Sequence, residues 1–160
     1  VSAGLNPPGG FLVGHVGMHE LNAGAAAGRL LADAGATKIV VVDHASYNSA
    51  LIDRLAGAQS EQRLSVVHID LIGDGVATDN DDAIAEHVAT ILEADPSIDG
   101  LLAMGSSMVR ASRNAMRQAG RDFIAGSFDS SPVLIEAIDA GEFFIFAVDQ
   151  QQYMQGYMGV

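Results

Sequence analysis

The feature that most constrains the fold is a regular alternation of short β-type runs with helical stretches. Strands are predicted near residues 11–16, 38–42, 65–69, 100–104, 123–127 and 144–148. The run Lys38–Val42 (KIVVV) is β-branched throughout its last four residues, which is typical of a strand buried on both faces. Strands that alternate with helices predict an α/β fold with a doubly wound, mainly parallel sheet and helices on both faces.

The ends of the predicted helices carry the expected capping residues. Gly35, Gly120 and Gly141 each follow a helical stretch, and Asn48 or Ser49 precedes one as its N-cap. The helices are predicted at 19–34, 48–62, 79–94, 106–119 and 132–140, with a last one from residue 151. Val1–Gly10 is rich in Pro and Gly and is interpreted as a linker, so the chain is predicted to form one domain.

Composition excludes several classes of function. Hydrophobic residues make up 49% of the chain, which supplies a core, and the net charge is −12 with 8 Lys and Arg residues. Nucleic acids and anionic membrane surfaces need cationic partners, so neither is an expected ligand. With no cysteine, disulfides and thiolate metal sites are excluded. No apolar run approaches a membrane span, and Val1–Gly10 carries no basic region of a signal peptide.

In doubly wound sheets the ligand lies beyond the carboxyl ends of the strands. Short polar side chains are frequent in the five segments at these positions, and Lys and Arg are absent from them, so phosphate is disfavoured. Asp, Asn, Gln and Ser offer donors and acceptors that match vicinal hydroxyls. The segments are Met18–Glu20, Asp43–Asn48, Met104–Ser107, Phe128–Ser131 and Asp149–Gln151.

Catalytic and cofactor signatures are absent. The chain contains no phosphate-binding loop, no dinucleotide fingerprint, no H-E-x-x-H and no G-x-S-x-G elbow. Its five histidines have no metal-ligand spacing. We therefore expect neither an enzyme nor a cofactor or metal.

Several polar residues have two readings from the sequence alone. Asp129 and Asn48 could each be a helix N-cap or contact a ligand. His44 could lie in a solvated loop or in the cleft, and Gln150 could contact a ligand after a buried strand. Arg54, beside Asp53 in a helix, is more readily explained by ion pairing or by bonds to carbonyl groups.

The same segments resemble type I periplasmic sugar-binding proteins, which feed ABC importers. The resemblance rests on HVGMHELNAG (His15–Gly24), VVVDHASYNSALIDRLAG (Val40–Gly57) with its Arg-x-x-Gly ending, and ILEADPSIDGLLAMGSSM (Ile91–Met108). The most specific match is FDSSPVLIEAIDAGEFFIFAVDQQQYMQGYMGV (Phe128–Val160).

The resemblance implies a two-lobed clamp that closes on a sugar, of which this chain is the second lobe. It implies an extracytoplasmic location, as a periplasmic protein or a surface lipoprotein, and a membrane permease as the partner of the assembled protein. It also implies recognition by hydrogen bonds without catalysis.

Ligand positions carry over residue by residue. Asp129 matches the family's sugar-binding aspartate, Gln150 a polar ligand at the third hinge crossing, and Asn48 a ligand at the start of a helix. Met18 stands where many members have a polar contact, and Gly105 replaces a common Asn.

Three further positions bear on which ligand the resemblance implies. Ile52 replaces a sugar-gripping Arg, Arg54 matches a second and mainly structural Arg, and Gln152 replaces a usual Pro. The losses at Ile52 and Gly105 leave fewer strong hydrogen bonds for an ordinary aldohexose or ribose, and they allow a deoxy-sugar, a polyol or another small polyhydroxylated compound. Two alternatives stay open: the effector-binding domain of a lactose-repressor-type transcription regulator, and an unrelated flavodoxin-like enzyme.

Overall fold

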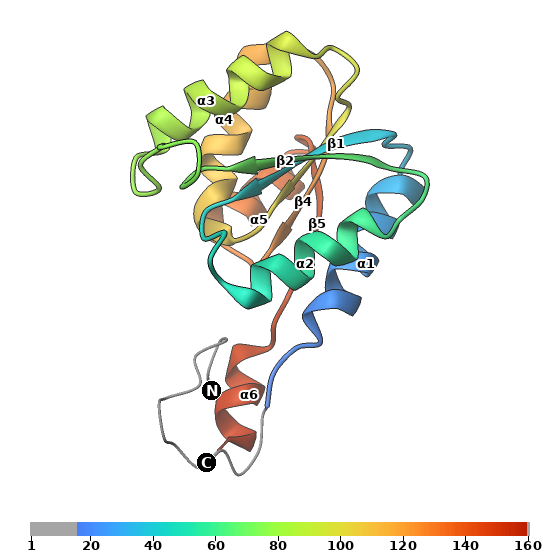
Figure 1. Ribbon diagram of the computed structural model, residues 1–160, viewed down its shortest axis with the longest axis vertical. Coiled ribbons are helices and arrows are strands. Elements are labelled where there is room, and N and C mark those ends of the chain that lie inside the picture. The colour runs from blue at the N-terminus through green and yellow to red at the C-terminus, as the bar shows by residue number, and fades with distance from the viewer. Residues whose placement is uncertain (1–15, 160) are drawn as a thin grey trace.

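The computed structural model describes residues 16–159 as a five-stranded parallel sheet with helices on both faces (Figure 1). The strand order is β2-β1-β3-β4-β5. The strands are β1 (Lys38–Asp43), β2 (Ser65–Asp70), β3 (Gly100–Ala103), β4 (Ile124–Phe128) and β5 (Phe144–Val148). The helices are α1 (Glu20–Asp33), α2 (Ser49–Gln59), α3 (Asp81–Ala94), α4 (Val109–Ala119), α5 (Pro132–Asp139) and α6 (Gln152–Met158), with a short 3₁₀ turn η1 (Ser106–Met108) before α4.

The predicted α/β class is confirmed, and five of the six predicted strands lie within two residues of their expected bounds. The strand expected at 11–16 lies outside the described residues, except for Val16, which is not in a strand. The helix expected to reach residue 62 ends at Gln59, with Ser60 as its C-cap. The helix expected from residue 79 begins at Asp81, because Asn80 caps it with its side chain.

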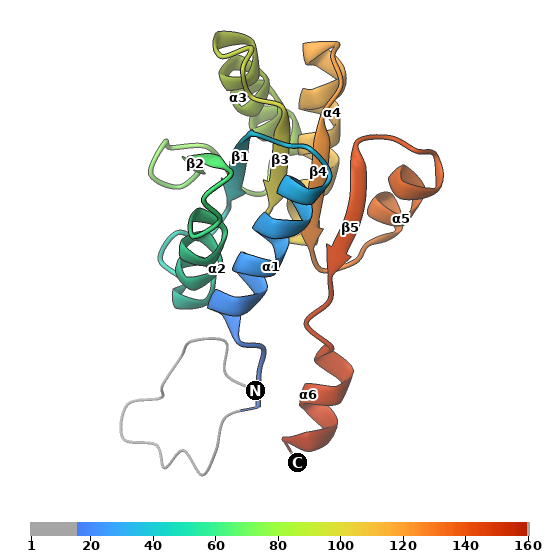
Figure 2. The ribbon, with the colours of Figure 1, turned by 90° about the vertical axis from the view of Figure 1, so that its right-hand side faces the viewer.

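Alternate side chains of the central strands β1, β3 and β4 enter two separate apolar layers. In β1, Val40 and Val42 pack with α3, α4 and α5, whereas Ile39 and Val41 pack with α1 and α2. Figure 2 shows this division, with α1 and α2 on one side of the sheet and α3 and α4 on the other. Burial on both faces explains why β1 and β3 are almost continuously apolar, whereas the edge strands β2 and β5 keep exposed positions.

Helices α1 and α2 cross with their backbones in contact. A β-carbon on Gly57 would lie 2.1 Å from the Leu21 carbonyl oxygen, and one on Gly24 would lie 2.0 Å from that of Arg54. No side chain fits between the two helices at these points. Gly57, the glycine of the Arg-x-x-Gly pattern, therefore allows the backbone of α2 to contact that of α1.

The described chain begins and ends at one edge of the sheet. In Figure 2 the start of α1 and the whole of α6 lie beyond the end towards which β5 points. This is the carboxyl edge, where the polar segments identified from the sequence also lie.

Candidate functional site

The parallel register places four predicted site residues along the carboxyl edge. Asn48 follows β1, Gly105 follows β3, Asp129 follows β4 and Gln150 follows β5. These four strands are consecutive neighbours in the sheet. Residues 16–159 therefore present a continuous polar rim at the edge where doubly wound folds bind ligands.

The side chains of Asp129 and Gln150 are hydrogen-bonded to each other. The Gln150 Nε2 group donates to both carboxylate oxygens of Asp129, at 2.8 Å each. Both residues are half-buried, and the pair joins the ends of β4 and β5. The Gln150 Oε1 atom accepts no hydrogen bond from the described residues, and the Asp129 carboxylate keeps further acceptor capacity, so the pair retains oxygen acceptors for a ligand.

Asp129 adopts a left-handed backbone conformation, with φ of 63°. This region is uncommon for residues other than glycine, although Asp tolerates it better than most. The N-cap reading of Asp129 is wrong, because Ser131 caps α5 by accepting from the Leu134 amide at 3.2 Å. The carboxylate of Asp129 is thus not used to cap the helix.

Asn48 is the N-cap of α2, as the sequence suggested. Its Oδ1 atom accepts from the Ala50 amide at 2.9 Å. The Nδ2 group forms no hydrogen bond with the described residues. Capping and ligand contact are therefore compatible, because they use different atoms of one side chain.

His44 and Gly105 are in direct contact across the ends of β1 and β3. A β-carbon on Gly105 would lie 2.9 Å from the His44 Cε1 atom. The ring is half-buried, and its Nδ1 atom is buried without a hydrogen-bond partner in the part of the chain that the structure describes. Burial is the largest cause that lowers the pKa of His44, and the charge of Arg54 lowers it further, against Asp43 and Asp129, which raise it.

Met18 and Ile52 contribute little polar chemistry to the rim. Met18 is half-buried and packs against the apolar layer under α1 and α2. Ile52 is 50% exposed on α2, at the position where the resemblance implied an Arg. The hydrogen bonds of this edge must come from the other positions.

Arg54 connects three elements beneath the rim. Its Nε donates to Glu20 Oε2 at 2.6 Å, and its Nη1 donates to the Met104 carbonyl oxygen at 3.2 Å. Its guanidinium carbon lies 4.4 Å from the centre of the Phe128 ring. The predicted structural role of Arg54 is confirmed, although its ionic partner is Glu20 and not the adjacent Asp53.

Glu20 belongs to the polar segment Met18–Glu20, but no sequence motif predicts a role for it. Its side chain is 18% exposed, and its Oε2 atom pairs with Arg54. Glu20 is the first residue of α1, where a carboxylate also suits the helix dipole. Its separation of 34 residues from Arg54 left no local signal for the pairing.

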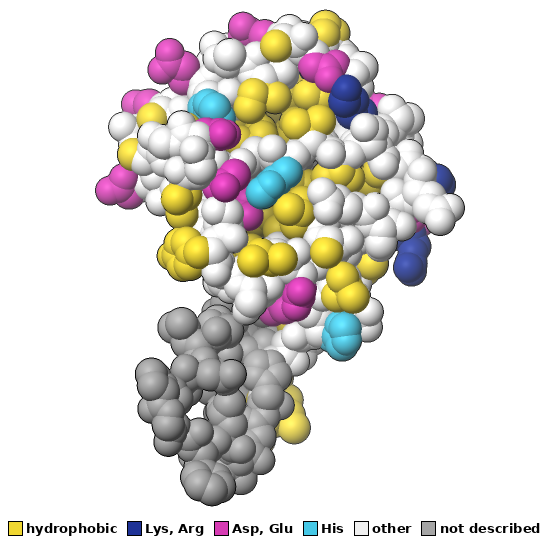
Figure 3. Space-filling model, in the orientation of Figure 1, with side chains coloured by type: hydrophobic (Ala, Val, Ile, Leu, Met, Phe, Trp, Pro, Cys, Tyr) yellow, Lys and Arg dark blue, Asp and Glu magenta, His cyan; other side chains and the backbone are white. Residues whose placement is uncertain are grey.

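Charge on the molecular surface agrees with the composition. Figure 3 shows acidic side chains spread over the visible face, with few Lys or Arg side chains. A helix long and apolar enough to cross a membrane does not occur among residues 16–159. The same residues contain no group of three His, Asp or Glu side chains placed to hold a metal ion.

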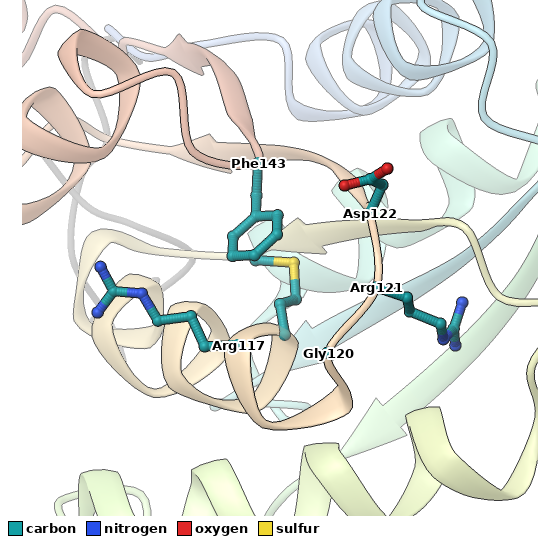
Figure 4. A pocket seen from close by; sticks show the side chains of 6 residues that line it. Arg117, Gly120, Arg121, Asp122 and Phe143 are labelled. Atoms are coloured by element: carbon teal, nitrogen blue, oxygen red, sulfur yellow. The ribbon is translucent and has the colours of Figure 1, made fainter.

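A hollow of about 300 Å³ lies near the amino ends of β4 and β5, away from the rim (Figure 4). Arg117 and Arg121 line it, but their guanidinium groups point to opposite sides. Arg117 pairs with Glu142 at 2.7 Å, and Arg121 donates to the Leu92 carbonyl oxygen at 3.0 Å. Both cations are thus engaged in contacts within the fold.

Comparisons with known proteins identify the type of domain. The family model described as "Periplasmic binding protein domain" matches residues 7–160. A search of curated proteins finds no match.

Solved structures share the fold. A carbohydrate transporter from Acidothermus cellulolyticus 11B in complex with myo-inositol is 26% identical, with a TM-score of 0.78 over 88% of this chain and 47% of that one. A periplasmic solute-binding protein of an ABC transporter from Actinobacillus succinogenes 130z with bound D-allose is 21% identical, with a TM-score of 0.75 over 90% and 51%. A sugar-binding protein of a sugar ABC transporter from Bacillus halodurans is 18% identical, with a TM-score of 0.79 over 94% and 53%. The chain thus spans about half the length of these structures.

Proposed function

This chain belongs to the family of periplasmic binding protein domains, and we propose that it is one lobe of the sugar- or polyol-binding component of an ABC importer. The observation that carries the proposal is the Asp129–Gln150 pair, which lies on a rim shared with Asn48 and Gly105. The rim lies where doubly wound folds bind ligands, and its oxygen acceptors suit the hydroxyl groups of a neutral polyol.

The ligand is held by hydrogen bonds and undergoes no reaction. Hydroxyl groups donate to the Asp129 carboxylate and to Gln150 Oε1, and the Nδ2 group of Asn48 donates to a ligand oxygen. The net charge of −12 and the carboxylates at this edge disfavour phosphorylated and acidic sugars. The myo-inositol complex of the Acidothermus cellulolyticus protein supports a small polyhydroxylated ring as the ligand class.

The second lobe, the permease and an extracytoplasmic location follow from the family as parts of the same proposal. Binding by this chain alone is expected to be weak, because a clamp takes its hydrogen bonds from both lobes. At about 1 kcal/mol for each neutral bond, losing four or five weakens binding by roughly a thousandfold. The transport proteins described above favour this function over the transcription-regulator alternative.

Titration of the chain with myo-inositol, D-allose, D-glucose and D-ribose at millimolar concentration, followed by NMR, tests the proposal. We expect saturable shifts of the Asp129 and Gln150 resonances with at least one compound. Asp129→Asn and Gln150→Leu should weaken that binding about tenfold or more. The first removes a charged acceptor for a ligand hydroxyl, and the second removes the Gln150 Oε1 acceptor together with the hydrogen bonds to Asp129.

Gln118→Leu is the matched control, because Gln118 is exposed on α4, away from the rim. It should bind like the unmodified chain. If none of the four compounds binds, or if Asp129→Asn and Gln118→Leu bind equally well, the proposed function is wrong.

A further inference from the structure

Gly105 has no conformational reason to be a glycine. Its φ is −170°, an extended backbone conformation that any residue adopts. The space around it gives a different reason. A β-carbon at this position would lie 2.9 Å from His44 Cε1, 3.6 Å from Nε2 and 3.7 Å from Nδ1. The imidazole ring therefore rests on the α-carbon of Gly105, and a side chain at residue 105 would displace it.

The polar atoms of the His44 ring are not used by the described part of the protein. The Nδ1 atom is buried and unpartnered, and Nε2 forms no hydrogen bond with residues 16–159. Buried N–H groups without acceptors are rarer than under-used acceptors. The proton is therefore better placed on Nε2, which leaves the buried Nδ1 as an unused acceptor.

The charged groups around the ring come from three elements. Asp43 is in β1, Arg54 is in α2 and Asp129 follows β4, and all three act on the titration of His44. On the side of β3 the ring meets Gly105, which is uncharged. Since burial lowers the pKa, the ring is neutral at pH 7 and can donate one hydrogen bond.

We propose that His44 contacts the ligand through Nε2–H, and that Gly105 and His44 form a matched pair that selects uncharged cyclic polyols. This inference rests on the proposed function. The rim otherwise presents mainly acceptors, Asp129 and Gln150 Oε1 among them. One ligand hydroxyl can donate to Asp129, and the same hydroxyl or its vicinal neighbour can accept from the His44 ring. A pair of vicinal hydroxyls therefore suits both residues.

The pair can be tested without any ligand by ¹⁵N NMR of the histidine rings. We expect His44 to carry its proton on Nε2 and to titrate below the ordinary histidine value. Gly105→Ala should move the His44 ring resonances and bring its pKa closer to the ordinary value, because the new methyl group pushes the ring towards solvent.

The ring of His87 serves as the internal control, since it pairs with Asp74 and shares no charged neighbour with His44. The His87 resonances should stay nearly unchanged in Gly105→Ala. A His44 proton on Nδ1, or a His44 ring that Gly105→Ala does not move, would overturn the matched pair.

Binding of myo-inositol, measured by NMR titration, tests the ligand contact. His44→Ala should weaken binding about five- to tenfold, the effect of one neutral hydrogen bond. Gly105→Ala should weaken it to a similar extent. In the double variant the two losses should not add, because Gly105→Ala acts by displacing a ring that is no longer there.

His87→Ala, on α3, is the matched control and should bind myo-inositol with unchanged affinity. Two outcomes would refute the role of His44 and leave the proposed function standing. One is that the losses add in the double variant. The other is that His44→Ala binds myo-inositol normally while Asp129→Asn does not. Failure of the unmodified chain to bind myo-inositol would refute the proposed ligand class, and if the other three compounds also fail, the proposed function falls with it.

Discussion

The guanidinium group of Arg54 lies 4.4 Å from the centre of the Phe128 ring, and it also bonds Glu20 and the Met104 carbonyl group. One buried cation thereby joins the start of α1 to the ends of β3 and β4. Residues 105 and 129 follow Met104 and Phe128 directly. The geometry of the rim therefore depends on a side chain that lies beneath it.

Replacing Arg54 by Leu should destabilise the fold. The Arg54 side chain is 4% exposed. The substitution leaves the half-buried carboxylate of Glu20 without its cationic partner. Breaking a buried ion pair on one side costs about 3–5 kcal/mol, and the partial exposure of Glu20 puts the expected loss near the lower end, about 3 kcal/mol. Urea unfolding followed by circular dichroism measures it.

Arg110→Leu is the matched control for that experiment. Arg110 is 64% exposed, and its nearest carboxylate oxygen, on Asp81, is 3.7 Å away. Its loss should change the free energy of unfolding by no more than about 0.5 kcal/mol. Equal effects at the two positions would show that Arg54 does not join the three elements energetically.

Gly57→Ala should also destabilise the protein, through a steric mechanism. The added methyl group would lie 2.1 Å from the Leu21 carbonyl oxygen, so α1 and α2 would have to move apart. Overpacking of this kind costs about 1–3 kcal/mol or more. Thermal unfolding should show a clearly lower Tm.

Gly156→Ala provides the comparison, because a β-carbon there meets nothing within 4 Å. Both substitutions replace a helical glycine, so helix propensity favours alanine in each. A Gly57→Ala variant at least as stable as Gly156→Ala would contradict the close crossing of α1 and α2.

The sequence predicted most of the fold because the parallel sheet is buried on both faces. Such strands are marked by continuous apolar runs such as KIVVV, and glycines mark where helices stop. Helix ends were less predictable, since Asn80 rather than Asp79 satisfies the first amide groups of α3. Local capping geometry decided these bounds.

The site was predictable only in part. Positions after strands indicated the rim, because parallel strands place their carboxyl ends at one edge. The contact of Arg54 with Glu20 and that of His44 with Gly105 connect residues 34 and 61 positions apart, respectively. No local pattern reports such pairs: the crossing of α1 and α2 brings the first pair together, and the pairing of β1 with β3 brings the second together.

Acid should weaken the fold through Glu142. Ion pairs with Arg113 and Arg117 lower the pKa of Glu142 from 4.5 to about 2. A carboxylate with a lowered pKa stabilises the native state at pH values above its unfolded pKa. This contribution is lost as the pH falls from about 4.5 to about 2.

Urea unfolding at pH 7, 4 and 3 measures the effect, with Glu142→Gln as the test variant. Glu142→Gln should lower stability at pH 7 and show a smaller further loss towards pH 3. Glu93→Gln, on an exposed face of α3, should follow the pH dependence of the unmodified chain. Parallel curves for Glu142→Gln and the unmodified chain would exclude the ion pairs as a source of acid sensitivity.

Asn48 allows capping to be separated from ligand binding. Its Oδ1 atom caps α2, and its Nδ2 group is the one available to a ligand. Asn48→Asp keeps an acceptor for the Ala50 amide, and its charge suits the helix N-terminus. Stability should therefore be retained in Asn48→Asp, whereas affinity for a polyol should fall about fivefold or more, because a donor has been replaced by an acceptor.

Asn80→Ala gives the converse result, because Asn80 caps α3 away from the rim, accepting from the Asp82 and Ala83 amides at 3.1 Å each. Removing that cap should cost about 1 kcal/mol of stability and leave polyol binding unchanged. Thermal unfolding and an NMR titration with the best-bound compound, run on both variants, separate the two roles. If Asn48→Asp binds the polyol as well as the unmodified chain does, then Asn48 is only a cap, and the donor to the ligand must come from another residue of the rim.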